Sequence, residues 1–326
     1  MFQGMRYVYE VYKEMSFSKA ARNLYISQPS LSAAVKKAEQ EAGFPIFDRS
    51  TSPIRLTEPG REYIRAVEMI LDVENGFQNY INDLNELRTG SISIGGTNLF
   101  VSFLLPPILS RFTARYPAVD IRLTEASTEE LTEKLFSGQL DLMIDNSHMD
   151  PSVYEKEFVC EEHLVLTVPK AFPSAARAAA FSLTAQDIRK GRHLKEETAP
   201  VPLDFFRDDP FLFLKSGNDT RSRAERICHA AHFVPHIRLK LDQQITAYNL
   251  SSYGMGISFT GDVLINRVPV SESLVFFKLG DQEAARRVHF YYKRNRYLSR
   301  TVRAFLTCAS DPSGLPQPSP GPSSPQ

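Results

Sequence analysis

SFSKAARNLYISQPSLSAAVKKAEQEAG, residues 16–43, predicts two short helices joined by a tight turn. The first helix is expected over about residues 18–24, where small and apolar side chains recur on one face. Ser27 is a good N-cap for the second helix, and Pro29 is tolerated in its first turn because N–H groups there have no intrahelical acceptor. This stretch therefore has the form of a DNA-reading helix-turn-helix.

The second helix is amphipathic in the way that groove insertion requires. Leu31, Val35 and Ala38 form an apolar stripe at i, i+4 and i+7. A different set of residues faces away from this stripe: Gln28, Ser30, Ser32, Ala33, Lys36 and Lys37. The alternative interpretation is an ordinary Ala-rich helix pair in a small helical domain.

The next segment, residues 44–57 (FPIFDRSTSPIRLT), predicts two short strands around a Thr-Ser-Pro turn. Each strand carries one basic residue, Arg49 or Arg55, placed to meet phosphates. Residues 17–55 hold six basic and three acidic side chains, although the net charge of the whole chain is zero. The pattern indicates a winged helix with a locally basic surface.

SFSKAARNLYISQPSLS, followed by FPIFDRS and IRLTEPG, resembles the N-terminal domain of LysR-type transcriptional regulators. The resemblance spans about sixty residues of winged helix, and the downstream chain also follows the family's plan. It implies a double-stranded DNA operator as the partner, and Gln28 has a side chain able to pair with an adenine. The DNA-binding residues expected here are Ser27, Gln28, Pro29, Ser30, Ser32, Ala33 and Lys36 on the helix, with Arg49 and Arg55 on the wing.

A heptad pattern begins after the wing and predicts a long linker helix. Thr57 is its expected cap, and Thr89-Gly90 its expected end. The narrow seam favours pairing with a second copy, and a twofold dimer would read two half-sites of a palindrome. The alternative is a helix packed on its own domain. The seam, at alternating spacings of three and four, comprises Tyr63, Ala66, Ile70, Val73, Phe77, Tyr80, Leu84 and Leu87.

After Gly90 strands alternate with helices, which predicts an α/β domain with a largely parallel sheet. A first lobe is expected from strands near 91–94, 120–126 and 140–145 with helices 100–116 and 127–136. Residues 157–168 would cross into a second lobe with strands 211–215, 236–241 and 255–259 and helices 220–231 and 242–253. Residues 270–279 and 287–292 would return to the first lobe, followed by a last helix at 299–308.

Two α/β lobes joined by two crossings resemble the effector-binding domain of the same family, which is similar in fold to periplasmic solute-binding proteins. The resemblance implies a ligand in the cleft between the lobes, where strand-to-helix loops offer free N–H groups and hydroxyls. The expected effector is a small polar or anionic metabolite. Its expected contacts are Thr97, Asn98, Ser127, Thr128 and Asn146 from the first lobe, and Lys215, Ser216, Asn218 and Ser258 from the second. Each of these loop residues also has an alternative role as a helix cap or turn residue.

The predicted organisation is α/β with an N-terminal winged helix-turn-helix at 1–60, a dimerisation linker helix at 61–89 and an effector-binding domain at 90–308. Lobe I would comprise 90–162 and 270–308, and lobe II 163–269. Residues 171–210 fit the lobe pattern poorly, and we expect an insertion or solvated surface excursion. The Pro/Ser/Gly-rich tail at 309–326 is expected to be disordered.

The composition excludes several classes of protein. A length of 326 residues with 42% hydrophobic and 23% charged residues is typical of a globular protein with two or three domains. Three widely spaced cysteines argue against a disulfide framework and for a reducing compartment. The N-terminus lacks a signal-peptide apolar region, and no stretch approaches the length of a membrane span. We therefore expect a cytoplasmic protein with no membrane association.

Enzyme motifs are absent from the sequence: there is no H-E-x-x-H, G-x-S-x-G, phosphate-binding loop or C-x-x-C. Zinc is chemically compatible with Cys228, His229, His232 and His236, but surface positions explain these residues as well. We expect no cofactor, no metal and no catalytic residues.

The functional prediction is a transcriptional regulator that binds a palindromic operator as a homodimer or homotetramer and responds to a metabolite, with RNA polymerase as a further partner. The alternative is a cytoplasmic solute-binding protein or enzyme with an incidental helical N-terminal domain.

Overall fold

The computed structural model describes residues 2, 4–51, 53–84 and 90–310. The chain divides into two compact units, with the bulk of one in residues 4–84 and the bulk of the other in residues 90–310. In the described part, no helix is both long enough and apolar enough to cross a membrane. The predicted tail at 311–326 lies outside the described residues.

Three helices form the core of the first unit: α1 (Met5–Glu14), α2 (Phe17–Asn23) and α3 (Gln28–Ala42). Ser27 caps α3 as predicted, because its hydroxyl accepts a hydrogen bond of 3.2 Å from the backbone N–H of Ser30. Gly43 ends the helix at a φ of 83°, a conformation that glycine adopts without strain. The core is built from small and branched side chains, including Val8, Val11, Ala20, Ala21, Leu31, Val35 and Ala38.

The predicted wing is present as the antiparallel strands β1 (Phe47–Asp48) and β2 (Arg55–Leu56). The Glu39 carboxylate on α3 accepts hydrogen bonds from the backbone N–H groups of Ile46 at 2.8 Å and Phe47 at 3.1 Å. These bonds fix the start of the wing against α3. The wing and the second helix of the motif therefore form one rigid surface.

The linker helix α4 (Glu58–Leu84) follows the wing. Thr57 caps it as predicted, since the hydroxyl of Thr57 accepts a hydrogen bond of 2.9 Å from the N–H of Gly60. Gly60 packs so closely on the carbonyl of Ile46 that a Cβ atom would not fit there. The predicted helix end at Thr89 and the seam residue Leu87 lie outside the described residues.

The first lobe of the second unit contains the parallel strands β3 (Ser91–Gly96), β4 (Asp120–Glu125) and β5 (Leu142–Asp145). Helices α6 (Thr128–Phe136) and α12 (Arg300–Ala309) complete it. The single helix expected at 100–116 is a π-helical turn, η1 (Phe100–Leu104), followed by α5 (Leu105–Arg115). Two consecutive prolines at the start of α5 have no N–H to donate, which accounts for the widened turn before them.

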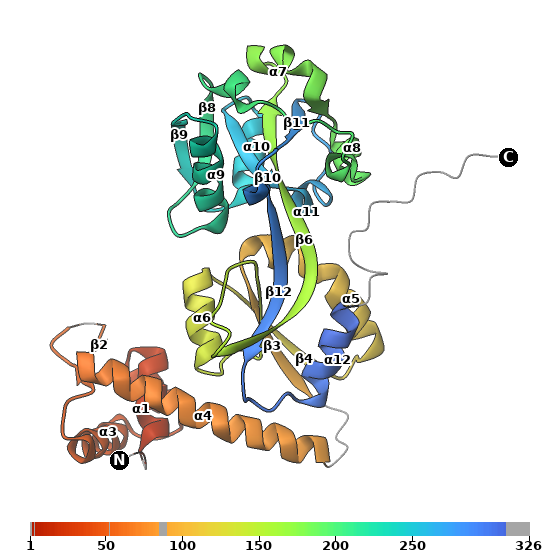
Figure 1. Cartoon of the computed structure of the whole chain (residues 1–326). Helices are drawn as coiled ribbons and strands as arrows, with labels where there is room; N and C mark the ends of the chain where they lie inside the picture. The colour runs from red at the N-terminus through yellow and green to blue at the C-terminus, as the bar shows by residue number, and fades with distance from the viewer. Residues whose placement is uncertain (1, 3, 52, 85–89, 311–326) are drawn as a thin grey trace. The chain divides into compact units, whose positions relative to one another are not determined.

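Two long strands, β6 (Tyr154–Pro169) and β12 (Ala285–Lys293), run between the lobes (Figure 1). They pair antiparallel from Tyr154 to His163 of β6, and β12 also pairs with β5. The whole sheet is therefore mixed rather than largely parallel.

The second lobe holds the parallel strands β8 (Pro210–Leu214), β9 (His236–Leu241) and β10 (Ile257–Gly261). Its helices are α9 (Asp219–Ala230), α10 (Gln244–Ser252) and the short α11 (Asp262–Ile265). β11 (Leu274–Lys278) pairs with the C-terminal half of β6 in this lobe. The prediction that residues 270–279 complete the first lobe is therefore wrong. The pairing of β11 with β6 joins segments that are far apart in the sequence, so no local pattern indicates it.

Residues 171–210 are folded into the second lobe, so the prediction of a solvated excursion is wrong. They form α7 (Pro173–Arg177), η2 (Ala179–Phe181), β7 (Ser182–Leu183), α8 (Ala185–Arg189), η3 (Arg192–Leu194) and η4 (Leu203–Phe206). Ala178, Ile188 and Phe206 are buried in its cores. Each of these short elements buries single apolar residues. The spacing of these apolar residues in the sequence has neither helical nor strand periodicity, so the pattern did not predict the elements.

Candidate functional site

The predicted DNA-reading residues lie on one exposed face at the N-terminal half of α3. Leu31, Val35 and Ala38 are buried beneath this face, as the amphipathic pattern predicts. Ser32 is half-buried, and the other helix positions are exposed: Ser27, Gln28, Pro29, Ser30, Ala33 and Lys36. The arrangement presents small polar side chains and one lysine on a rigid support, which suits insertion into a DNA groove.

The sequence predicts Tyr25 in the turn between the two helices, and the structure adds that its side chain lies exposed on this surface. It forms the turn between α2 and α3 at a φ of 54° and is 96% exposed. A non-glycine residue at positive φ is uncommon, and a fully exposed aromatic side chain beside the reading helix is available to a partner.

The two wing arginines differ in their surroundings. Arg49 pairs with Glu39 at 2.9 Å, and its guanidinium lies 4.7 Å from the centre of the Phe17 ring. Arg55 is exposed on β2, opposite Asp48 in the strand register. Arg49 therefore supports the wing itself, whereas Arg55 is the simpler candidate for a phosphate contact.

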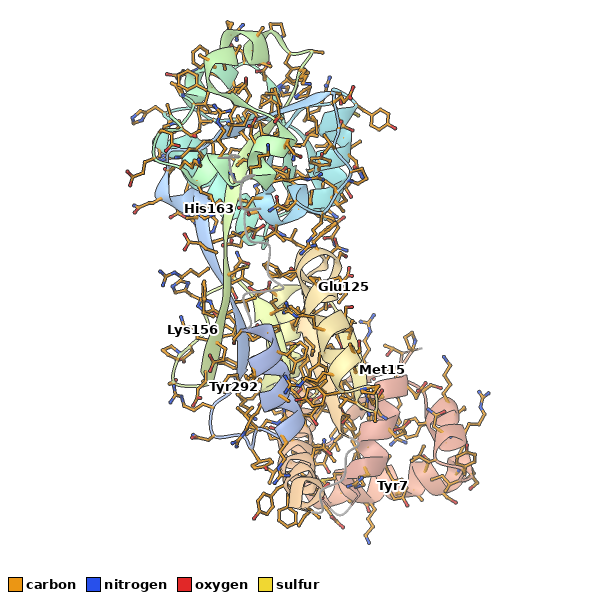
Figure 2. The ribbon with its side chains drawn as sticks, turned by 90° about the vertical axis from the view of Figure 1, so that its right-hand side faces the viewer. Tyr7, Met15, Glu125, Lys156, His163 and Tyr292 are labelled. Carbon is orange, nitrogen blue, oxygen red and sulfur yellow. The ribbon has the colours of Figure 1, made fainter. Side chains whose placement is uncertain are left out.

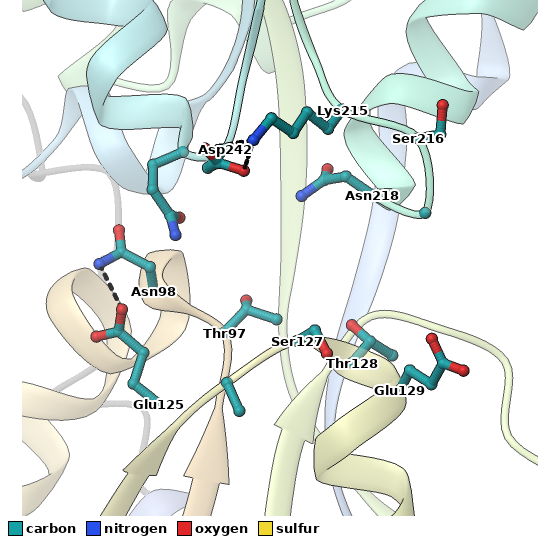
Figure 3. Close-up of a pocket in the computed structure, with 13 residues that line it drawn as sticks. Thr97, Asn98, Glu125, Ser127, Thr128, Glu129, Lys215, Ser216, Asn218 and Asp242 are labelled. Carbon is teal, nitrogen blue, oxygen red and sulfur yellow. Dashed lines mark hydrogen bonds and ion pairs between the residues drawn. The ribbon is translucent and has the colours of Figure 1, made fainter. Parts of the chain in front are cut away.

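The second unit has a pocket of about 410 Å³ between its lobes, drawn in Figure 3. Seven of the nine predicted effector residues line it: Thr97, Asn98, Ser127, Thr128, Lys215, Ser216 and Asn218. They come from the loops that follow β3 and β4 in the first lobe and β8 in the second lobe, whose strands run the opposite way and end at the same pocket. Gly217, at a φ of +87°, turns the loop that enters α9.

Helix N-termini approach the pocket from both lobes. α6 begins beside Ser127 and Thr128, α9 begins after Asn218, and α10 begins after Gln243, which also lines the pocket. Free N–H groups and the helix dipole favour a negatively charged or polar group at such positions. Some polar side chains are already engaged, since Ser127 caps α6 and the Thr128 hydroxyl donates to Asp145 at 3.0 Å.

The pocket also contains carboxylates that the sequence analysis missed. Glu125, Glu129 and Asp242 line it. The side-chain amide of Asn98 donates to Glu125 at 3.1 Å, and Lys215 pairs with Asp242 at 2.7 Å. These acidic residues lie at strand ends and helix starts. In the sequence alone, acidic residues at such positions can equally be interpreted as helix caps.

Two predicted effector residues lie outside this pocket. Ser258 is fully buried on β10, and its hydroxyl is 2.9 Å from that of Ser251. The side-chain amide of Asn146 donates to the Asp219 carboxylate, so it links the lobes rather than facing the pocket. The prediction of both as pocket residues is wrong for this arrangement.

Asn146 joins a buried ionic cluster where the two lobes meet. Arg286 on β12 donates to Glu162 at 2.7 Å and to Asp219 at 2.9 Å, and its side chain is 2% exposed. Burial opposes ionisation of Asp219, yet Arg286 and Arg223 hold its pKa below the usual value. Burial raises the pKa of the Glu162 carboxyl, although Arg286 opposes this shift. The cluster is therefore a hydrogen-bonded polar core at the crossing between the lobes.

The cysteines of the described chain are free. Burial raises the pKa of Cys228 to about 12, so this thiol stays protonated near neutral pH. Cys228 faces the core, whereas His229, His232 and His236 are exposed.

An exposed reading helix with a wing, combined with a two-lobed α/β domain that encloses a polar pocket, defines a DNA-binding regulator with a ligand-binding domain. Residues 2–61 match the family described as bacterial regulatory helix-turn-helix protein, lysR family, and residues 85–311 match the LysR substrate binding domain. The chain belongs to the LysR family of transcriptional regulators. It is a transcriptional regulator and not an enzyme, so the alternative of a solute-binding protein or enzyme is wrong.

Curated relatives match along nearly the whole chain. The uncharacterized HTH-type transcriptional regulator YcgK of Bacillus subtilis (strain 168) is 30% identical over 306 residues, covering 93% of this chain and 91% of the relative. The probable RuBisCO transcriptional regulator of Emiliania huxleyi is 25% identical over 304 residues, covering 92% and 91%. Both names describe regulators of transcription.

Solved structures share the fold. A full-length OxyR variant from Pseudomonas aeruginosa matches with a TM-score of 0.72 at 20% identity, covering 97% of this chain and 96% of that one. Full-length CbnR in complex with its target DNA matches with a TM-score of 0.62 at 16% identity, covering 95% and 98%. The predicted winged helix and two-lobed α/β architecture is therefore confirmed.

Proposed function

We propose that this regulator binds a palindromic operator as a homodimer or homotetramer, with α3 in the major groove and the wing on the phosphate backbone. The main support for this proposal is the exposed polar face of α3 above a buried apolar stripe. The groove residues proposed are Ser27, Gln28, Pro29, Ser30, Ser32, Ala33 and Lys36, with Arg55 and Arg49 toward phosphates. A cytoplasmic location follows from the chromosomal target, and regulation requires that bound protein alters the action of RNA polymerase.

Self-association is supported by the outer part of α4. Of the heptad seam, Tyr63 is buried in the core of the first unit and Ile70 packs against that core, so the start of the seam packs on its own domain. Farther along, Val73 is 73% and Phe77 is 65% exposed, and Tyr80 stacks on Phe77 with ring centres 6.4 Å apart. An exposed apolar stripe of this length on a helix fits pairing with a second copy.

The proposed effector is a small metabolite with an anionic group and a second group that donates hydrogen bonds. The helix N-termini of α6, α9 and α10 support the anionic group. The carboxylates of Glu125 and Glu129 support a donor or an ammonium group on the same molecule. Such a ligand would contact both lobes and stabilise their closed arrangement.

Gln28→Ala is expected to weaken binding to the specific operator by about 1–3 kcal/mol, because a base-edge contact carries sequence information. Binding to random DNA should hardly change. Arg55→Ala should weaken binding to both DNAs and reduce the salt slope by about one. Affinities of the two variants measured on operator and random duplexes over a range of salt concentrations test this contrast. Equal losses on operator and random DNA for Gln28→Ala would contradict the base-reading role.

Thr97→Val is expected to lower effector affinity by about 1–3 kcal/mol while operator binding without effector is retained. The Thr97 hydroxyl makes no hydrogen bond to the described residues and borders the pocket, so valine keeps the shape but removes the donor (Figure 3). A panel of small metabolites screened for thermal stabilisation of the wild type identifies the ligand to be titrated against the variant.

The matched control is Thr113→Val on α5, whose hydroxyl donates to the Leu109 carbonyl at 2.9 Å outside the pocket. Affinity for the stabilising metabolite, measured by calorimetry, should be the same in this control as in the wild type. Loss of affinity in both variants, or in neither, argues against the pocket as the effector site.

A further inference from the structure

Two histidines and an aspartate from three separate segments meet in the second lobe. His163 lies on β6 where that strand enters the lobe (Figure 2). His193 belongs to η3, within the segment that the sequence analysis treated as an excursion, and Asp262 begins α11 after β10. Each of the three offers one ligand atom, and these atoms lie within 4.8 Å of one another.

The distances suit a small metal ion. The Nε2 atom of His193 is 3.0 Å from Oδ2 of Asp262, and the Nδ1 atom of His163 is 3.7 Å from the same oxygen. Zinc bonds of about 2.0–2.2 Å in a tetrahedron place neighbouring ligand atoms ~3.3 Å apart. The second distance is too long for a hydrogen bond, and within the described chain His163 Nδ1 is a buried nitrogen without a hydrogen bond.

Burial and hydrogen bonding hold the three groups in place. His193 is 4% and Asp262 7% exposed. The Oδ1 atom of Asp262 accepts the backbone N–H of His163 at 3.0 Å, which leaves Oδ2 facing both imidazoles.

The outer side of the cluster provides access and orientation. A cavity of about 470 Å³ is lined by His163, His193 and Glu161, so an ion and a water ligand have a path to the imidazoles. The Nε2 atom of His163 is 3.3 Å from the Glu161 carboxylate. A carboxylate that accepts the outer N–H of a histidine orients it for metal binding through its other nitrogen.

We propose that His163, His193 and Asp262 bind one divalent transition-metal ion of the zinc class, with a fourth position open to the cavity. Two imidazoles and a carboxylate are ligands that Zn²⁺ accepts and that hard cations such as Mg²⁺ do not select. The ion fastens η3, and with it residues 171–210, to β6 at the crossing between the lobes. This role is separate from the effector pocket, since none of the three residues lines that pocket.

The test uses the full-length protein stripped with EDTA, incubated with ZnSO₄ and dialysed, followed by elemental analysis. The wild type should retain about one zinc per chain above any surface background, and Zn²⁺ should raise its melting temperature. His193→Ala should raise the Kd for Zn²⁺ at least about 100-fold, since loss of even an outer-shell partner costs 10–100-fold. The double variant His229→Ala/His232→Ala removes two exposed histidines and should keep wild-type zinc binding.

A second variant covers the case in which the buried His193→Ala protein does not fold. His163→Gln changes a partly exposed side chain, and circular dichroism checks its fold before zinc is added. It should lose the retained zinc while its helix content stays unchanged. Wild-type protein that retains no zinc, or zinc binding unaffected by both single variants, overturns the proposal and leaves a hydrogen-bonded His-Asp-His cluster.

Discussion

Arg286→Ala is expected to destabilise the second unit by about 3–5 kcal/mol, because it leaves the fully buried Glu162 carboxylate without its partner. Asp219 and the Thr220 hydroxyl lose the same guanidinium. A charge removed from water costs several kcal/mol unless a partner compensates for it. The free energy of unfolding from urea titration, followed by circular dichroism, measures the loss.

The neighbouring Arg287→Ala is the matched control, because that side chain is largely exposed and lies 4.0 Å from Glu161. It should change stability by less than about 1 kcal/mol. The double variant Glu162→Leu/Arg286→Met removes both charges and should recover much of the loss. A cost below about 1 kcal/mol for Arg286→Ala would contradict the view that Arg286 compensates for the buried Glu162 carboxylate.

Phe77→Lys is expected to separate the proposed dimer. Its affinity for an operator with two half-sites should fall by a factor of about 10²–10⁴, because binding through two linked subunits supplies a gain of this size. The substitution places an ammonium in the exposed stripe of α4, where pairing would take it out of water. Affinity for a single half-site should hardly change. Sedimentation and titration of both DNAs measure the two effects.

Asn75→Lys introduces the same charge two residues away, on another face of the exposed part of α4. This control should remain a dimer and bind the operator as the wild type does. Should Phe77→Lys sediment as an intact dimer, the pairing surface inferred for α4 is wrong.

The DNA-reading part was predictable because its determinants are local. The serine cap of α3, its i, i+4, i+7 stripe and its terminal glycine all lie within the stretch that they organise. The heptad register of α4 predicted the apolar face of the helix but not what packs against that face. Tyr63 and Val73 carry the same apolar signal, yet one is buried in its own unit and the other is exposed. Periodicity identifies the apolar face of a helix but does not say what covers it.

The loops that form the pocket were predicted from the strand ends, but the acidic side chains that line the pocket were not predicted. The loops after β3 and β4 lie at one edge of the first lobe because parallel strands end there, and the loop after β8 meets them from the second lobe. Glu129 and Asp242 were missed because acids at helix starts are common as caps and dipole partners. Ser258 was misplaced because the strand predicted at 255–259 is found two residues later, as β10 (Ile257–Gly261), so Ser258 lies at the buried start of the strand rather than near its end.

Long-range clusters were beyond any local pattern. His163, His193 and Asp262 are separated by 30 and 69 residues in the chain, and Glu162 is 124 residues from Arg286. Their meeting depends on how β6 pairs with β10 and β12. The fold of residues 171–210 could not be predicted for the same reason. Their buried side chains pack into cores that are built from strands distant in the sequence.

The most direct test of the regulator account is a footprint of the wild-type protein on genomic DNA fragments that it selects. The account predicts a discrete protected region with two half-sites related by approximate twofold symmetry, spaced by whole helical turns of about 10 base pairs. A stabilising metabolite should alter the extent of protection. Uniform protection that falls with salt and shows no boundaries, or a single unpaired half-site, would contradict it.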